Sequence, residues 1–150
     1  MSCSNNRHKS CHDKSCQRYY NNAIQPFIAD TAIQLEIAGA KVVDSGIAID
    51  TEPLNYTINK TGLYHIAADL VVTAVTAGIG TLRVYLDGVP LPCTVRTVSL
   101  PVGNTEIHTE TDLRFDNCCC DVSHSITFML DPGGAVGSVV EFCSGVLKLA

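Results

Sequence analysis

An alternation of apolar and polar residues runs through most of this chain and constrains its fold more than any other feature. In LYHIAADLVVTAVT, residues 63–76, every second side chain from Tyr64 to Val72 is apolar, and the intervening positions start with His65. Successive residues of a β-strand point to opposite faces, so a period of two predicts a half-buried strand. No stretch shows the 3.6-residue repeat of an amphipathic helix. The sequence therefore predicts an all-β fold.

Similar runs recur every ten residues or so and are separated by Gly, Pro, Asp and Asn, which favour turns. In RVYLDGVPL, Asp87-Gly88 supplies the positive φ angles of a tight type I′ hairpin turn. LDPGGAVGSVV is predicted as a second hairpin with a longer glycine loop. About nine strands at this spacing are typical of an antiparallel sandwich or jelly roll. The predicted strands cover residues 33–38, 46–50, 54–59, 62–74, 80–87, 89–100, 105–116, 122–131 and 138–149.

The chain divides by composition into an arm, residues 1–22, and a body, residues 23–150. The arm mixes polar residues without periodicity, so we expect it to be extended or disordered when isolated. It carries four basic side chains and one acidic one, whereas the body carries six basic and fourteen acidic side chains. A basic arm on an acidic body can dock on a neighbouring copy. Nucleic acid is not expected as a partner, because the body would repel phosphate.

The whole chain of 150 residues is long enough for one jelly-roll domain with a real core. Only 17% of its residues are charged, so we expect a partner subunit to cover part of its neutral surface. Its polar start lacks the apolar core of a signal peptide, and no apolar run approaches the roughly 20 residues that span a bilayer. We therefore expect synthesis in the cytosol without a signal peptide, release by lysis, and no membrane span.

Eight cysteines are the most unusual content of the chain: Cys3, Cys11, Cys16, Cys93, Cys118, Cys119, Cys120 and Cys143. A zinc site would draw on Cys3, Cys11, His12 and Cys16, with His8 as a spare. Zinc suits these ligand types, but the arm lacks two close ligand pairs of the usual spacing. We therefore expect no metal; the weak candidates are Cys11, His12, Cys16 and His108.

Thiol catalysis needs a base near the cysteine. His124 follows Cys120 by four residues, which on a strand means about 13 Å, too far for a hydrogen bond. The chain has no C-x-x-C redox pair. A third interpretation is that Cys93 and Cys143 fill core space as small apolar side chains.

Disulfide cross-linking of all eight cysteines is the interpretation we favour. Cys118 and Cys120 share a strand face about 6.6 Å apart, badly aimed for a mutual bond, so they need partners elsewhere. The arm holds three cysteines and the body five. Both numbers are odd, so full pairing requires an arm-to-body bond or a bond between chains. An arm of this length can extend about 65 Å, far enough to reach a neighbour after the chain leaves the reducing cytosol.

Polar side chains gather on one predicted strand, TEIHTETDL. Glu106, His108, Glu110 and Asp112 share one face, and Ile107, Thr109, Thr111 and Leu113 share the other. We favour a solvated polar face; a metal site and a pH-sensitive cluster along a trimer axis are the alternatives. His65, with the same parity as Asp69, is expected to be a hydrogen-bonded polar side chain and not a catalyst.

Several short motifs resemble one known family. TGLYHIAADL resembles a strand of the tumour necrosis factor-like (TNF-like) and complement-head-like jelly rolls, and RVYLDGVPL lies where that family has an Asn-Gly or Asp-Gly turn. NAIQPFIADTAIQLEIAGAKVVDSGIAI resembles the opening of bacterial versions on exosporium glycoproteins. No collagen-like Gly-X-Y stalk precedes this body, and the Cys-rich arm looks instead like that of endospore appendage subunits, which are cross-linked by arm disulfides. The resemblance implies a homotrimeric head with a structural role.

These observations together predict a structural, self-assembling subunit of a spore or cell-surface appendage or exosporium layer, without cofactor. Its expected partner is itself, in a homotrimer and a higher-order fibre or layer, and a collagen-like tip protein is a further candidate. Its expected location is the spore surface or the extracellular space. The alternative is a receptor- or glycan-binding tip of a phage or surface fibre. A zinc-dependent enzyme is a weaker rival, and we expect no catalytic residues.

Overall fold

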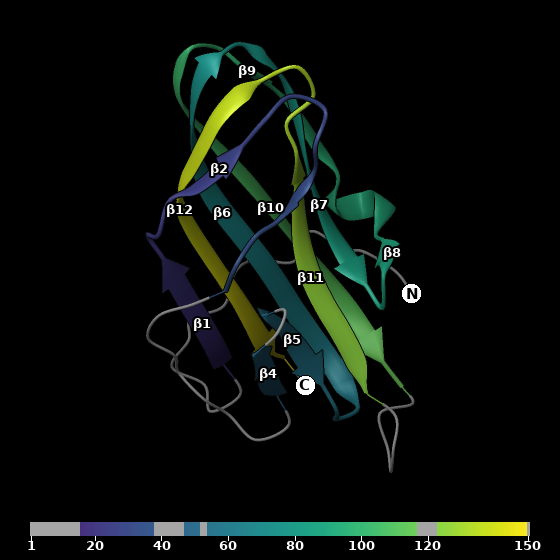
Figure 1. The fold of residues 1–150 in the computed structure, drawn as a ribbon. Helices are drawn as coiled ribbons and strands as arrows, with labels where there is room; N and C mark the ends of the chain where they lie inside the picture. Colours follow the sequence, from purple (N-terminus) through teal and green to yellow (C-terminus); the bar gives the residue numbers. More distant parts are fainter. Residues whose placement is uncertain (1–15, 38–46, 52–53, 117–122, 150) are drawn as a thin grey trace.

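Two antiparallel sheets pack face to face in the computed structural model (Figure 1). The model describes residues 16–37, 47–51, 54–116 and 123–149. The predicted sites at Cys3, Cys11, His12 and 118–120 lie outside these residues. In chain order the elements are β1 (Cys16–Asn21), β2 (Gln25–Phe27), β3 (Ile33–Gln34), β4 (Ile47–Thr51), β5 (Leu54–Ile58), β6 (Gly62–Thr76), β7 (Gly78–Leu86), β8 (Val89–Pro90), the short 3₁₀ helix η1 (Pro92–Thr94), β9 (Arg96–Leu100), β10 (Gly103–Phe115), β11 (His124–Asp131) and β12 (Val136–Lys148).

The five-stranded sheet has the order β1-β12-β6-β10, with β2 also paired to β12. The seven-stranded sheet has the order β4-β5-β11-β7-β8, with β3 on β11 and β9 on β7. Strands distant in sequence are neighbours: β12, the last strand, lies between β1 and β6. These crossovers are typical of a jelly roll. Among the described residues, no helix is long and apolar enough to cross a membrane.

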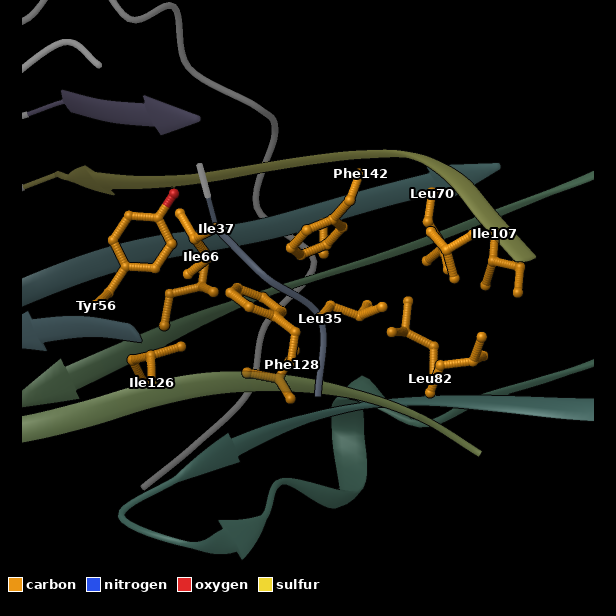
Figure 2. Close-up of a cluster of buried hydrophobic side chains, with 14 of the residues drawn as sticks. Leu35, Ile37, Tyr56, Ile66, Leu70, Leu82, Ile107, Ile126, Phe128 and Phe142 are labelled. Carbon is orange, nitrogen blue, oxygen red and sulfur yellow. The ribbon is translucent and has the colours of Figure 1, made fainter. Parts of the chain in front are cut away.

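The core lies between the sheets and uses the predicted apolar positions. Tyr64, Ile66, Ala68 and Val72 of β6 are fully buried, and Leu70 is nearly so. Figure 2 shows side chains of both sheets meeting in this layer. The Phe128 ring of β11 packs edge-on against the Phe142 ring of β12, with 5.4 Å between centroids. Burying each such side chain contributes about 1.5–3 kcal/mol, so this layer holds the sheets together.

The predicted strand 89–100 is wrong, because prolines divide it. Pro90 ends β8, Pro92 begins η1, and the chain resumes as β9 at Arg96. Proline has no backbone N–H to donate to a strand ladder, and its fixed φ favours the first turn of a helix. The Thr94 hydroxyl closes the turn by donating to the Leu91 carbonyl at 2.7 Å.

The two predicted hairpins have different outcomes. Asp87 and Gly88 have φ angles of 51° and 82°, which confirms the type I′ turn between β7 and β8. The second hairpin is wrong, because β11 and β12 belong to different sheets. Its loop crosses between the sheets, and Gly133 has φ 57° there. A Cβ on Gly133 would lie 2.3 Å from the Ile79 carbonyl oxygen, so only glycine fits this crossing.

The N-terminal part of the described chain contains strands that the sequence did not predict. β1 lies within the segment predicted as an extended arm and pairs with β12 from Cys16↔Leu147 to Asn21↔Phe142. β3 is shorter than the predicted strand 33–38. Leu35 nevertheless stays buried and donates its backbone N–H to the Phe128 carbonyl. The arm is therefore joined to the body through the edge of the five-stranded sheet.

Candidate functional site

The outer face of the five-stranded sheet carries a large group of titratable side chains. The parity of β10 is as predicted: Ile107, Thr109, Thr111 and Leu113 are buried toward the core. The opposite parity puts six β10 side chains outward, from Asn104 to Arg114, and cross-strand pairing aligns them with outward residues of β6 and β12. The outward residues of this face include Tyr20, His65, Ala67, Asp69, Glu106, His108, Glu110, Asp112, Arg114, Glu141, Cys143 and Gly145.

Two histidines and three carboxylates on this face form a continuous ladder between β6 and β10. His65 Nδ1 lies 2.6 Å from Asp112 Oδ1, and His108 Nδ1 lies 2.6 Å from Asp69 Oδ1. Each of these pairs joins residues directly opposite in the β6–β10 register. Glu110 Oε2 lies between them, 3.4 Å from Nε2 of each histidine. Carboxylates and imidazoles therefore alternate along the ladder, and each Nδ1 contact fixes the orientation of its ring.

The ladder runs from the interior of the protein to solvent. His65 and Asp112 are only 3% and 2% exposed, whereas His108 and Asp69 are 50% and 61% exposed. The expected solvated polar face is therefore correct for the outer end only. The inner pair is a buried polar pair, joined through His65 Nδ1 and Asp112 Oδ1. His65 is the hydrogen-bonded polar side chain that the sequence predicted.

A second polar pair lies beside the ladder, where β1 joins the sheet. The Tyr20 hydroxyl donates a short hydrogen bond to Glu141 Oε1. This bond, and the negative charge of Glu141, raise the pKa of Tyr20 above its ordinary value of 10.0. Burial raises the pKa of the neighbouring Tyr19 for a different reason, because its phenolate would lose water.

Two adjoining hollows follow these side chains across the sheet, and we call them together the acidic groove. The smaller, of about 240 Å³, lies over Ala67 and Gly145 and is walled by His65 and Glu110. The larger, of about 480 Å³, is lined by Tyr20, Glu106 and Glu141 among others. Both hollows share Asp69, His108 and Cys143. Ala67 and Gly145 are cross-strand neighbours, and their small size leaves the smaller hollow open.

The structure describes side chains for two of the eight cysteines. Cys143 is a free, half-buried thiol of β12 that lines both hollows of the acidic groove. Cys93 of η1 is half-buried, with its Sγ 3.4 Å from Thr111 Oγ1. Neither belongs to the buried apolar core, so neither serves as the core filler that the third interpretation required. The cross-linking role of all eight stays a prediction.

Most of the metal-ligand candidates lie outside the described side chains. Of the weak candidates, only His108 has a described side chain, and its ring is held between Asp69 and Glu110. Within the described ranges, no three His, Cys, Asp or Glu side chains are arranged to hold a metal ion. His124, the base considered for Cys120, instead has its Nδ1 2.7 Å from Asp87 Oδ2 and its ring 4.8 Å from that of Phe115. It therefore helps to hold the turn after β7.

Sequence reasoning found the outward row of β10 but not its partners. The pairing of His108 with Asp69 and of His65 with Asp112 depends on how β6 and β10 align. Local alternation gives the face of each residue and leaves this alignment undetermined. The usable signal was the matching spacing: His65 and Asp69 are four residues apart, as are His108 and Asp112, in opposite order. Antiparallel pairing then brings each histidine to a carboxylate.

Comparisons with known proteins identify the fold. No family model and no curated protein matches the sequence. The TNF Eiger from S. frugiperda has a similar structure over 90% of this chain and 92% of its own, with a TM-score of 0.60 and 11% identity. The PRD1 vertex protein P5 is similar over 90% of this chain and 73% of its own, with a TM-score of 0.52 and 18% identity. The chain therefore has the TNF-like jelly-roll fold that the sequence predicted. At these identities, the likeness carries the fold alone.

Proposed function

We propose that this chain is a structural subunit that assembles with copies of itself on a spore or cell surface, in an appendage or exosporium layer. Its TNF-like jelly roll is the head, which forms homotrimers, and its Cys-rich arm links heads through disulfides. The chain performs no catalysis in this role. A jelly roll shared with a phage vertex protein fits a surface assembly.

One observation carries the proposal: Cys143 is a free thiol on the outer face of the sheet whose edge strand, β1, is part of the arm. A cysteine that serves packing belongs in the core. This one faces outward, where an arm cysteine of another copy can reach it. A disulfide between chains would contribute about 2–4 kcal/mol, and its larger effect would be kinetic, because linked subunits cannot dissociate on heating.

A denaturing gel of air-oxidised, boiled and alkylated protein tests the proposal. We expect a ladder, or material retained in the well, that collapses to the 16.0 kDa chain on reduction. Sedimentation of the reduced protein then measures whether the heads alone form trimers. A 16.0 kDa band both with and without reductant would rule out covalent assembly.

One specific feature favours the alternative, a receptor- or glycan-binding tip. Four apolar side chains, each more than 60% exposed, lie in turns and strand ends at one end of the sandwich: Ile28, Val75, Ile79 and Val102. Backbone contacts bring these turns together, since Gly103 pairs with Ala74, and Gly133 lies between Asp30 and Ile79. Exposed apolar groups at one end are typical of a binding surface. Under this alternative, replacing them with serine abolishes attachment to a target and leaves the gel ladder unchanged.

A further inference from the structure

We propose that the acidic groove is the docking site for residues 1–15 of a second copy of the chain, and that Cys143 forms the disulfide with a cysteine of that arm. The inference rests on the proposed function and deepens it, because it names the surface and the body cysteine that receive the arm. Shape, charge, thiol chemistry and chain direction each support it.

The groove has the size and form to accept a peptide. Its larger hollow, about 480 Å³, falls within the roughly 300–1,000 Å³ range of ligand pockets. The smaller hollow continues it over Ala67 and Gly145. A glycine inside a strand often marks a place where another backbone approaches closely. Gly145 lines the smaller hollow and has no side chain to obstruct such an approach.

Charge matches the groove to the arm. Four carboxylates line the groove: Asp69, Glu106, Glu110 and Glu141. Residues 1–15 carry Arg7, Lys9 and Lys14 against a single acidic residue, Asp13. The arm is therefore basic where the groove is acidic. Two acidic grooves facing each other would repel, so the arm suits this surface better than a second groove does.

Cys143 gives the groove a reactive group. It is free, half-buried and common to both hollows. A docked arm would bring Cys3 or Cys11 to it. A disulfide needs Cα atoms about 4.4–6.8 Å apart, so the arm cysteine would have to lie directly over Cys143.

The direction of β1 favours the arm of another copy. Tyr20 pairs with Cys143, and Cys16 pairs with Leu147, near the end of β12. From Tyr20 to Cys16, β1 therefore runs away from Cys143, over about 13 Å. Its own arm would have to reverse to enter the groove. An arm of 15 residues extends about 50 Å, enough to reach the groove of a neighbour.

The bond-forming step is a two-electron oxidation. The thiols of Cys143 and the arm cysteine lose two protons and two electrons as the sulfur–sulfur bond forms. Dissolved dioxygen accepts both electrons and both protons and becomes hydrogen peroxide. This requirement places the step after the chain has left a reducing compartment.

Disulfide mapping on an isotope mixture tests the inference on the unmodified full chain. Equal amounts of ¹⁵N-labelled and unlabelled protein are reduced, mixed and air-oxidised. They are then alkylated and cleaved after Lys, Arg and Glu. Cleavage after Glu141 separates the Cys143 peptide, 142–148, from Cys118–Cys120. We expect this peptide joined to one containing Cys3 or Cys11, with labelled and unlabelled halves mixed in about half of the pairs.

Variants inside the groove, each with a matched control outside it, distinguish cross-linking at this site from cross-linking elsewhere in the chain. Cys143→Ser should remove the groove-linked species, whereas Cys93→Ser, which removes a cysteine outside the groove, should retain it. Glu106→Lys should slow cross-linking about tenfold at low salt, at the low end of electrostatic steering effects. Asp30→Lys, in the turn after β2, changes charge equally and should not slow it. About 0.5 M salt should shrink the Glu106→Lys effect, since screening then acts over a few ångströms.

The possible outcomes distinguish failure of the docking site from failure of the proposed function. A wild-type ladder whose linked peptides omit Cys143, or join it only within one isotope, overturns the docking site and leaves covalent assembly in place. No ladder at all overturns the proposed function itself. Because the mapping uses wild-type protein, a variant that fails to fold does not remove the test.

Discussion

The two outer faces of the sandwich differ sharply in chemistry. On the five-stranded sheet, β6, β10 and β12 present five carboxylates, two histidines and a free thiol, with Arg114 as the basic exception. On the seven-stranded sheet, the outward residues of β7 and β11 are mainly neutral, with Arg83 and Asp131 as charged exceptions: Ile79, Thr81, Arg83, Tyr85, Ser125, Thr127, Met129 and Asp131. On both faces, the outward residues alternate along each strand with residues buried in the shared core.

This difference agrees with the proposal that the acidic face takes part in assembly. A sheet face that points away from the core needs only polar or small side chains. The neutral face has such side chains, and few of them are charged. Hydrogen-bonded and ionisable groups cost more to arrange, since a buried polar group must find a partner. Their concentration on the face that includes β1 supports the proposed role of this face as the assembly surface. If this holds, removing a polar pair from this face should affect the folded protein more than removing a polar side chain from the opposite face.

The largest effect is expected at the inner end of the ladder. Asp112→Ala removes the partner of His65 and leaves that ring buried, so we expect a loss of about 3 kcal/mol in the free energy of unfolding. Thr127→Ala, on the opposite face, should change it by less than about 0.5 kcal/mol. Urea unfolding of the reduced protein measures both. Equal, small losses would mean that the inner pair does not stabilise the fold.

A smaller effect is expected at the outer end of the same ladder. Asp69→Ala removes the partner of His108, but both side chains are at least half exposed. Solvated ion pairs contribute about 0–1 kcal/mol, so the loss should stay below about 1 kcal/mol and shrink further in high salt. The same unfolding assay applies. A loss as large as that of Asp112→Ala would refute the gradient of burial along the ladder.

The smallest effect concerns Tyr20 and appears in its titration. Its pKa is raised in the folded protein, so the stabilisation is fully present below pH 10 and is lost as pH rises through the folded-state pKa. Glu141→Gln should lower the pKa of Tyr20 toward 10.0, its ordinary value. Phenolate absorbance against pH, with Tyr20→Phe as the control that identifies the signal, measures the shift. An unchanged titration in Glu141→Gln would show that Glu141 does not govern Tyr20.

The fold could be predicted where alternation is strong and local. β6 and β10 have the predicted faces, because each buries a regular apolar row. Strand 89–100 failed because prolines override β propensity, and the second hairpin failed because a loop sequence does not reveal whether it crosses between sheets. β1 was not predicted because its sequence, CQRYYN, is mainly polar. It forms a strand by pairing with β12, which lies at the far end of the sequence.

Part of the candidate site could also be predicted from local alternation. The row from Glu106 to Asp112 follows from the sequence of one strand, whereas its contacts with β6 follow from the strand register. The groove depends on where small and large side chains of three strands meet, at Ala67, Gly145 and Cys143. No single stretch of sequence contains that information.

Carboxylate footprinting on assembly tests the central claim most directly. A water-soluble carbodiimide with an amine labels accessible carboxylates in the reduced, separated protein and in the oxidised assembly. The account predicts that Glu106 and Glu141 become protected on assembly, while Asp131 of the opposite face keeps its reactivity. Unchanged labelling of Glu106 and Glu141 in a covalent assembly, or protection of Asp131 alone, would contradict the assignment of the acidic face as the assembly surface.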